Sequence, residues 1–290
     1  MNSWLDKVEY PFVPRYFEVN AGRLHYVDEG SGDHALLMVH GNPSWSFIYR
    51  HLIKGLCSEY RCIAVDHIGF GLSDKPEDWS YLPEEHARNL DALMEHLNPK
   101  NVTMVVQDWG GPIGLSYALK HPEKIRSLVI MNTWMWPVKG DRHYERFSGL
   151  MGGVVGRFLI RRFNFFVKAV MKEAYGDKSK LTKRIHAEYL NALAVPAERK
   201  GCWTFPKQII GSSEWLGQLW EQRNKIADKP ALILWGDKDI AFREKELNTW
   251  KQLFHNAEVN RYPDVGHYVQ EELGSGLCPV IEEFLSKSGE

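Results

Sequence analysis

The chain has 290 residues, 44% of them hydrophobic, and its 36 lysines and arginines nearly cancel its 37 aspartates and glutamates. This length suits one large α/β domain with an insertion and a sizeable buried core. No stretch concentrates positive charge, so the sequence gives no reason to expect a nucleic-acid partner. We therefore expect one elaborated domain whose partner is a small, uncharged molecule.

The amino terminus and the cysteines argue against several other protein classes. Residues 1–7 lack the basic start and apolar stretch of a secretory signal, and no apolar run approaches membrane-spanning length. The cysteines lack the close pairs of a zinc site or a disulfide scaffold, and the histidines form no ligand cluster. We expect a soluble cytoplasmic protein with no membrane partner, no metal and no cofactor. The cysteines are Cys57, Cys62, Cys202 and Cys278.

The first half of the chain alternates strand-like and helix-like segments. Residues 16–20 and 24–29, around Ala21-Gly22, are typical of an antiparallel hairpin. The short apolar runs that follow predict strands covered on both faces. Strands alternating with helices indicate a parallel, doubly wound sheet whose functional groups gather at the carboxyl ends of the strands. The predicted strands are 35–39, 62–65, 102–106 and 128–131, and the helix-like segments are 82–97 and 114–120.

From about residue 137 to residue 229 the sequence changes to long helix-compatible stretches rich in aromatic residues. Strand-like runs return at 231–235 and 258–262. We interpret this pattern as a helical cap, residues 137–229, inserted into a main domain formed by residues 1–136 and 230–290. Such a cap roofs a pocket and keeps water out.

Asp108 lies between a predicted strand and a predicted helix that begins near Pro112. This is the context of a nucleophile elbow, in which a tight turn lifts one side chain above the sheet. Aspartate stands where serine is usual, and Val106 replaces the first glycine of the usual motif. Taken alone, an aspartate at a strand end is more often a helix cap or a structural carboxylate.

Two later residues strengthen the interpretation of Asp108 as a nucleophile. Asp239 follows the predicted strand 231–235, and His267 follows the last predicted strand. Nucleophile, acid and histidine is the chain order of the triad in this fold. Asp237 competes as the acid, but the position of Asp239 matches the pattern of the fold.

The chemistry of a carboxylate nucleophile differs from that of a serine. Asp108 needs no base to activate it, because a carboxyl group with a pKa of about 4 is already ionised at neutral pH. Attack on carbon creates an ester, and His267, oriented by Asp239, then activates water to hydrolyse that ester. The sequence thus predicts a hydrolase that works through a covalent intermediate.

Two neutral hydrogen-bond donors flank the predicted nucleophile. Asn42, in the sequence His40-Gly41-Asn42-Pro43 after the strand 35–39, offers a side-chain amide, and Trp109 offers an indole N–H. Aimed neutral donors suit a departing halide ion, which a dry cavity does not release easily without them. Each residue considered alone is more typical of a turn or of core packing.

With these motifs in place, the chain resembles the haloalkane dehalogenases of the α/β-hydrolase superfamily, from the amino-terminal hairpin to the last helix. The resemblance implies Asp108 as nucleophile, His267 as base, Asp239 as acid, and Asn42 with Trp109 as halide donors. It also implies release of an alcohol and a halide without a cofactor. The resemblance is carried by residues 40–43 (HGNP), 66–74 (DHIGFGLSD) and 107–111 (QDWGG), by Asp239, and by Gly266-His267.

The same resemblance narrows the subfamily. Asn132-Thr133 occupies the other place at which members carry the acid, and it holds no carboxylate. The chain therefore looks like the subfamily that combines an aspartate acid with an asparagine and tryptophan halide pair. Other members of the family use a cap tryptophan as the second halide donor. Trp134, Trp136 and Trp203 are available for that role in this chain. We take Trp136, Phe205 and Pro206 as candidate pocket-lining residues.

Two alternatives stay open. An epoxide hydrolase shares the aspartate nucleophile, but its loop usually carries an aromatic residue where Asn42 stands, and it needs two cap tyrosines. Tyr144, Tyr175 and Tyr189 are candidates for that role. A ligand-binding receptor on a hydrolase fold is the second alternative, and a complete triad argues against it. The pair Arg161-Arg162 is interpreted as a solvated helix face.

Overall fold

The computed structural model describes residues 3–288 and is built on one eight-stranded sheet with the order β1-β2-β4-β3-β5-β6-β7-β8. The hydrophobic strands β3 to β7 form its centre and carry the buried core. The strands are β1 (Arg15–Val19), β2 (Gly22–Glu29), β3 (His34–Val39), β4 (Arg61–Val65), β5 (Asn101–Asp108), β6 (Ile125–Thr133), β7 (Ala231–Gly236) and β8 (Glu258–Tyr262).

The pairing of the strands confirms the expected α/β class. The hairpin β1–β2 and the pair β2–β4 are antiparallel, whereas β3, β4, β5, β6, β7 and β8 pair in parallel. Parallel strands need crossover connections, and helices supply them here. Because the parallel strands share one direction, the loops after β3, β5, β7 and β8 open at the same edge of the sheet.

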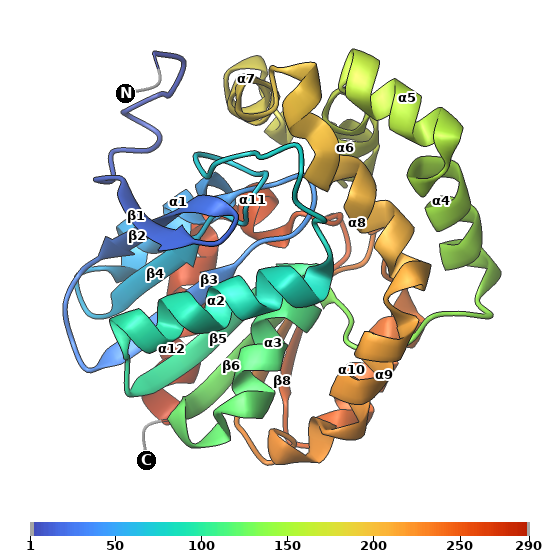
Figure 1. Cartoon of the computed structure of the whole chain (residues 1–290). Coiled ribbons are helices and arrows are strands. Elements are labelled where there is room, and N and C mark those ends of the chain that lie inside the picture. Colours follow the sequence, from blue (N-terminus) through green and yellow to red (C-terminus); the bar gives the residue numbers. More distant parts are fainter. Residues whose placement is uncertain (1–2, 289–290) are drawn as a thin grey trace.

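Helices cover both faces of this sheet (Figure 1). α2 and α3 pack together, and α1 contacts α11 and α12. The helix predicted to begin near Pro112 begins at Gly110. Gly110 lies so close to the backbone carbonyl of Val39 that any side chain there would collide with it. Glycine therefore lets this helix start directly after the elbow. The helices outside 137–229 are α1 (Arg50–Leu56), α2 (Pro83–Leu97), α3 (Gly110–Lys120), α10 (Glu244–Leu253), α11 (Val269–Leu273) and α12 (Cys278–Lys287).

The stretch predicted as a cap is helical and lies between β6 and β7. Figure 1 shows α4 to α8 gathered at one end of the sheet, while α9 contacts α3 and α8. The division into main domain and cap stays a prediction, and residues 1–2 and 289–290 lie outside the described residues. The helices of this stretch are α4 (Arg142–Gly152), α5 (Val154–Phe163), a π-helix (Phe166–Val170), α6 (Met171–Ala174), α7 (Lys183–Ala192), α8 (Lys200–Gly211) and α9 (Ser213–Glu221).

Within residues 3–288, every helix is too short or too polar to cross a bilayer.

Candidate active site

Asp108 ends β5 in a strained conformation, with φ of +50°. This left-handed region is unfavourable for any residue with a Cβ atom, and such strain is typical of functional turns. The loop after β3 comes so close to the Asp108 side chain that a Cβ atom at Gly41 would collide with the Asp108 carboxylate. The backbone N–H of Asn42 donates to Asp108 Oδ1 over 2.7 Å. The turn therefore presents one carboxylate oxygen to a backbone donor and leaves Oδ2 available.

The structure brings His267 and Asp239 to Asp108. His267 Nδ1 lies 2.9 Å from Asp239 Oδ2, and His267 Nε2 lies 3.6 Å from Asp108 Oδ2. All three groups are largely buried. The competing acid Asp237 instead forms an ion pair with Arg261 over 2.9 Å. The imidazole is thus held by one carboxylate through Nδ1 while Nε2 faces the other.

Asn132 orients Asp239, a role that the sequence did not reveal. The Asn132 side-chain amide donates to Asp239 Oδ2 over 2.8 Å and is itself fixed by the backbone of Gly236. The backbone N–H of Ala241 donates to Asp239 Oδ1 over 2.7 Å. Both carboxylate oxygens are therefore hydrogen-bonded, which fixes the orientation of the Asp239 carboxylate beside His267.

For Asp108 and for His267, burial and neighbouring charges shift the pKa in opposite directions. Burial raises the pKa of the Asp108 carboxyl above its ordinary value, although the charge of His267 and the backbone N–H groups of Trp109 and Asn42 oppose the rise. Burial lowers the pKa of His267, but the charge and hydrogen bond of Asp239 outweigh it, so this pKa lies above its ordinary value. The site therefore favours an imidazole that can accept and hold a proton.

Gln107 contacts the nitrogen of His267 that faces Asp108. Its side-chain Nε2 lies 2.8 Å from His267 Nε2 and 3.1 Å from the backbone carbonyl of His267. An amide donor at Nε2 matches the tautomer in which Nδ1 carries the hydrogen and points to Asp239. Sequence reasoning assigned Gln107 no role, because only the return of the last loop to β5 brings the two residues together.

Asn42 and Trp109 both line the cavity above Asp108. The Asn42 amide donates to the backbone carbonyl of Cys202 over 3.3 Å, and since an amide nitrogen carries two hydrogens, a second N–H remains. The Trp109 indole stacks on Phe205, with ring centroids 5.2 Å apart, and meets Trp134 edge-on. Packing thus fixes the plane of the indole beside the nucleophile.

The cavity has a volume of about 90 Å³ and is mostly apolar. Of the candidate pocket-lining residues, Pro206 lines it, whereas Trp136 and Phe205 do not. Trp136 packs against Trp220 and Trp250 instead, and Phe205 lies behind the Trp109 indole. The lining residues are Asn42, Asp108, Trp109, Trp134, His143, Tyr144, Phe147, Phe166, Val170, Ala174, Pro206, Ile209, Ile240, Ala241, Phe242, His267 and Tyr268.

A buried carboxylate, Glu272, fastens the loop of His267 to the segment after α6. It accepts hydrogen bonds from the backbone N–H groups of Gly266 (2.9 Å), Gly176 (3.2 Å) and Asp177 (2.9 Å). The backbone N–H of His267 also donates to the carbonyl of Ala174 over 2.8 Å. One side chain therefore joins the histidine loop to the segment that follows Ala174, a residue of the cavity lining.

Comparison with known proteins identifies the family to which the chain belongs. The model of the α/β hydrolase fold family matches residues 34–272. Haloalkane dehalogenase 2 of Mycobacterium tuberculosis is 36% identical over 276 residues, which cover 94% of this chain and 95% of that protein. The chain belongs to the haloalkane dehalogenase family of α/β hydrolases.

One further relative carries the same family name and another carries a different one. A haloalkane dehalogenase structure from Bradyrhizobium elkani superposes with a TM-score of 0.82 at 25% identity, covering 95% of this chain and 99% of that one. A cis-3-alkyl-4-alkyloxetan-2-one decarboxylase of Shewanella oneidensis is 33% identical over 287 residues, which cover 96% of this chain and 90% of that protein. The haloalkane dehalogenase resemblance expected from the motifs is therefore confirmed.

Three tyrosines between β6 and β7 bear on the epoxide hydrolase alternative to a haloalkane dehalogenase. Tyr144 lines the cavity, whereas Tyr175 and Tyr189 are buried outside its lining. The Tyr189 hydroxyl donates to Glu271 over 2.5 Å. Ring opening of an epoxide needs two tyrosines, and one of the three candidates reaches the cavity.

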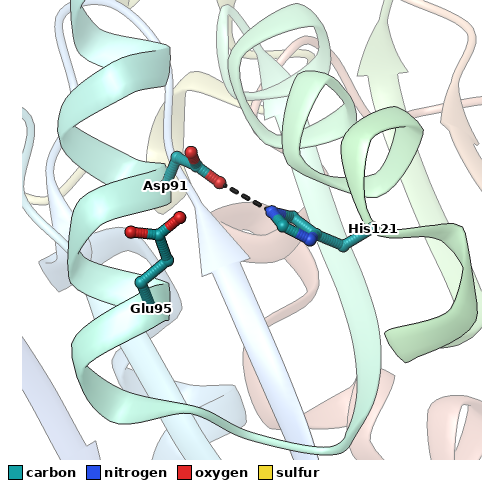
Figure 2. A group of neighbouring side chains, drawn as sticks. All are labelled: Asp91, Glu95 and His121. Atoms are coloured by element: carbon teal, nitrogen blue, oxygen red, sulfur yellow. Dashed lines mark hydrogen bonds and ion pairs between the residues drawn. The ribbon is translucent and has the colours of Figure 1, made fainter.

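A second polar cluster lies away from the dehalogenase-type cavity. Figure 2 shows Asp91 and Glu95 of α2 near His121, which follows α3, with His121 Nε2 2.9 Å from Asp91 Oδ1. The ammonium group of Lys120 also pairs with Asp91 and lies 3.9 Å from Glu95 Oε1. This cation offsets part of the charge of the carboxylates, so we interpret the cluster as a surface ion-pair network.

Proposed function

We propose that the protein hydrolyses the carbon–halogen bond of small haloalkanes to an alcohol, a halide ion and a proton. The observation that carries the proposal is the placement of Asp108 Oδ2 and His267 Nε2, 3.6 Å apart, beside the donors Asn42 and Trp109 in one small apolar cavity. An ionised carboxylate, a base and two neutral donors are the groups that this reaction needs.

In the first step, Asp108 Oδ2 attacks the carbon that bears the halogen. The carbon–halogen bond breaks, its electron pair leaves with the halide, and an alkyl ester forms on Asp108. The side-chain N–H groups of Asn42 and Trp109 stabilise the departing halide in a cavity that excludes water. This step needs no proton transfer, so His267 takes no part in it.

In the second step, His267 Nε2 accepts a proton from a water molecule whose oxygen attacks the carboxyl carbon of the ester. The backbone N–H of Asn42, already 2.7 Å from Asp108 Oδ1, stabilises the oxyanion that develops there. Asp239 stabilises the imidazolium. Collapse releases the alcohol and regenerates the Asp108 carboxylate, and the proton on His267 returns to solvent.

A second candidate function comes from the decarboxylase relative, whose named substrate is a four-membered lactone with two neighbouring alkyl groups. Such a lactone loses carbon dioxide and leaves an alkene. The cavity of about 90 Å³ favours the haloalkane, because a lactone with two alkyl groups needs more room than a small haloalkane.

The test uses three substrates with distinct products. The protein is incubated separately with 1,2-dibromoethane, with styrene oxide and with a cis-3,4-dialkyl-oxetan-2-one, while bromide, diol and alkene are measured. Bromide and acid release without diol supports the proposal. Alkene formation without bromide release would assign the chain to the decarboxylases, and diol formation alone would make it an epoxide hydrolase.

A receptor with an idle triad would behave differently from all three enzymes. In that case no chloro-, bromo- or iodoalkane releases halide, while a small apolar ligand raises the thermal unfolding midpoint. The comparison of halide release with ligand-induced stabilisation separates a binding protein from an enzyme. We expect the protein to release halide. We also expect Asp108→Asn to abolish this release.

A further inference from the structure

One outer face of the cap concentrates the exposed apolar side chains of the protein. Over the part of the chain that the structure describes, ten large hydrophobic residues are exposed, and six of them lie between residues 150 and 195. Isolated exposed apolar residues are ordinary, but a cluster of them marks an interaction surface. The six are Leu150 (63% exposed), Val154 (87%), Val155 (62%), Phe158 (59%), Phe163 (50%) and Val195 (48%).

The helix α5 forms the centre of this surface, which we call the α5 face. Figure 1 shows α5 at the outer edge of the cap, away from the sheet. α5 contacts α4 and α8, and its buried residues are Gly156 and Ile160, so the exposed residues are not needed for the core. Phe158 and Phe163 contact each other edge to face at 5.8 Å and hold their rings on the surface. The apolar exposure is therefore a property of the folded cap.

Basic residues predominate around the α5 face, although Arg161 pairs with the exposed carboxylate of Glu77 over 3.1 Å. Residues 146–168 contain no aspartate or glutamate, although the whole chain has a net charge of −1. The same stretch contains Arg146, Arg157, Arg161, Arg162 and Lys168. All five of these basic side chains are exposed. The face thus combines large apolar groups with a local excess of cations.

Three of these arginines surround a hollow in the α5 face. The hollow has a volume of about 430 Å³ and is lined by Val154, Phe158, Pro196 and the side chains of Arg157, Arg161 and Arg162. Guanidinium groups bind phosphate oxygens through paired hydrogen bonds. An apolar floor with a guanidinium rim suits a group that is anionic at one end and apolar at the other.

Charge decides between the occupants of this face. A second copy of the chain in a symmetric dimer places the same patch on both sides, so Arg157, Arg161 and Arg162 face their own equivalents. Such like-charge contact is unfavourable. A bilayer with anionic headgroups pairs the arginines and accepts the apolar side chains at its headgroup boundary, as basic amphipathic helices do.

We propose that the α5 face docks the cap on the surface of an anionic lipid bilayer, with Val154 and Phe158 at the headgroup boundary and Arg157, Arg161 and Arg162 on lipid phosphates. This contact is peripheral, so it needs no membrane-spanning helix. It differs from the expectations that the pair Arg161-Arg162 is a solvated helix face and that the protein has no membrane partner. It stands independently of the proposed function, but it places a haloalkane hydrolase where apolar substrates concentrate.

The test measures co-sedimentation of the full chain with vesicles. Vesicles of phosphatidylcholine that contain phosphatidylglycerol should bind the protein at low salt, and vesicles of phosphatidylcholine alone should bind it weakly. Raised salt should weaken the binding because it screens the arginines. Arg162→Gln should lower the affinity about fivefold, the effect of one basic residue near an anionic surface.

Apolar variants complete the test. The pair Val154→Glu and Phe158→Glu should lower the affinity at least about tenfold. Val13→Glu is the matched control, because Val13 is also exposed (65%) but lies near the amino terminus, outside the α5 face. Circular dichroism and the thermal unfolding midpoint check that each variant is folded. Halide release from 1,2-dibromoethane in the absence of vesicles should be unchanged.

Three outcomes would overturn the proposal. The first is equal binding to vesicles with and without phosphatidylglycerol. The second is equal loss of binding in Val13→Glu and in the α5 variants. The third is an absence of vesicle binding together with a dimer in sedimentation velocity that Phe158→Glu dissociates, which would make the face an interface between copies. Because vesicle binding is measured without a substrate, its failure is distinguishable from failure of the proposed function.

Discussion

The carboxylate of Glu272 accepts a hydrogen bond of 2.9 Å from the backbone N–H of Gly266, the residue directly before His267. Its other partners, Gly176 and Asp177, belong to the segment after α6. The position of the histidine is therefore coupled to the segment after α6 through a residue that lies outside the cavity lining. Glu272 acts as a positioning residue.

Glu272→Gln should slow ester hydrolysis by about tenfold while alkylation of Asp108 changes little, because only hydrolysis depends on the placement of His267. An amide cannot accept at both ends, so the variant loses at least one of the backbone bonds. Rapid quenching followed by intact-mass spectrometry measures the two steps separately. Glu246→Gln is the control, since Glu246 is also buried and accepts a backbone N–H, at 2.8 Å from Arg243, outside the site. An equal slowing of both steps would reduce Glu272 to a structural role.

His267→Phe should accumulate a covalent adduct on Asp108. Attack by the carboxylate survives because it needs no base, whereas hydrolysis of the ester loses its base. Phenylalanine retains the stacking of this ring on Phe242, at a centroid distance of 5.7 Å, which limits the loss of stability. Intact-mass spectra with 1,2-dibromoethane measure the adduct, and the double variant with Asp108→Asn should show none. A His267→Phe variant without adduct, under conditions where the parent protein turns over, contradicts the two-step mechanism.

Asn42→Ala and Trp109→Phe should each lower kcat roughly a hundredfold, the usual effect of removing one aimed donor. Both should also weaken bromide binding, which quenching of tryptophan fluorescence or calorimetry measures. Trp136→Phe is the matched control for the indole, because Trp136 is buried but lies outside the cavity lining. If Trp109→Phe and Trp136→Phe have the same effect, the indole N–H has no role in halide release.

The two steps should separate with pH. The pKa of His267 lies above its ordinary value of 6.5, and a protonated imidazole cannot serve as the base. The pKa of Asp108 is raised from 3.8 by burial, so alkylation fails only as the pH falls toward the acid range of this carboxyl. Hydrolysis should therefore rise with pH through the His267 pKa, and the ester should accumulate on the acid side of it. Single-turnover measurements at about pH 5.5 and about pH 8 check this, and a pH-independent adduct level would contradict it.

The sequence predicts the sheet and the triad because both depend on local patterns. The apolar runs match the buried strands, and the order of Asp108, Asp239 and His267 reflects their positions at strand ends. The structure adds the distances, which no pattern contains.

The supporting residues could not be predicted, because their partners lie far away in the chain. Gln107 reaches His267 across 160 positions, and Asn132 reaches Asp239 across 107. Aromatic character suggests Trp136 and Phe205 as pocket-lining residues, but it does not say which side of a ring faces a cavity. Trp136 packs on Trp220 and Trp250, and Phe205 supports the indole from behind.

The φ of +50° at Asp108 positions the nucleophile but lowers the stability of the fold. A left-handed conformation costs a residue with a Cβ atom roughly 1 kcal/mol, and glycine avoids this cost. Asp108→Gly should therefore be more stable to thermal unfolding than Asp108→Ala, although both lack the nucleophile. A population selected for stability alone would drift toward glycine here, so retention of aspartate in an evolving lineage records continued demand for the reaction.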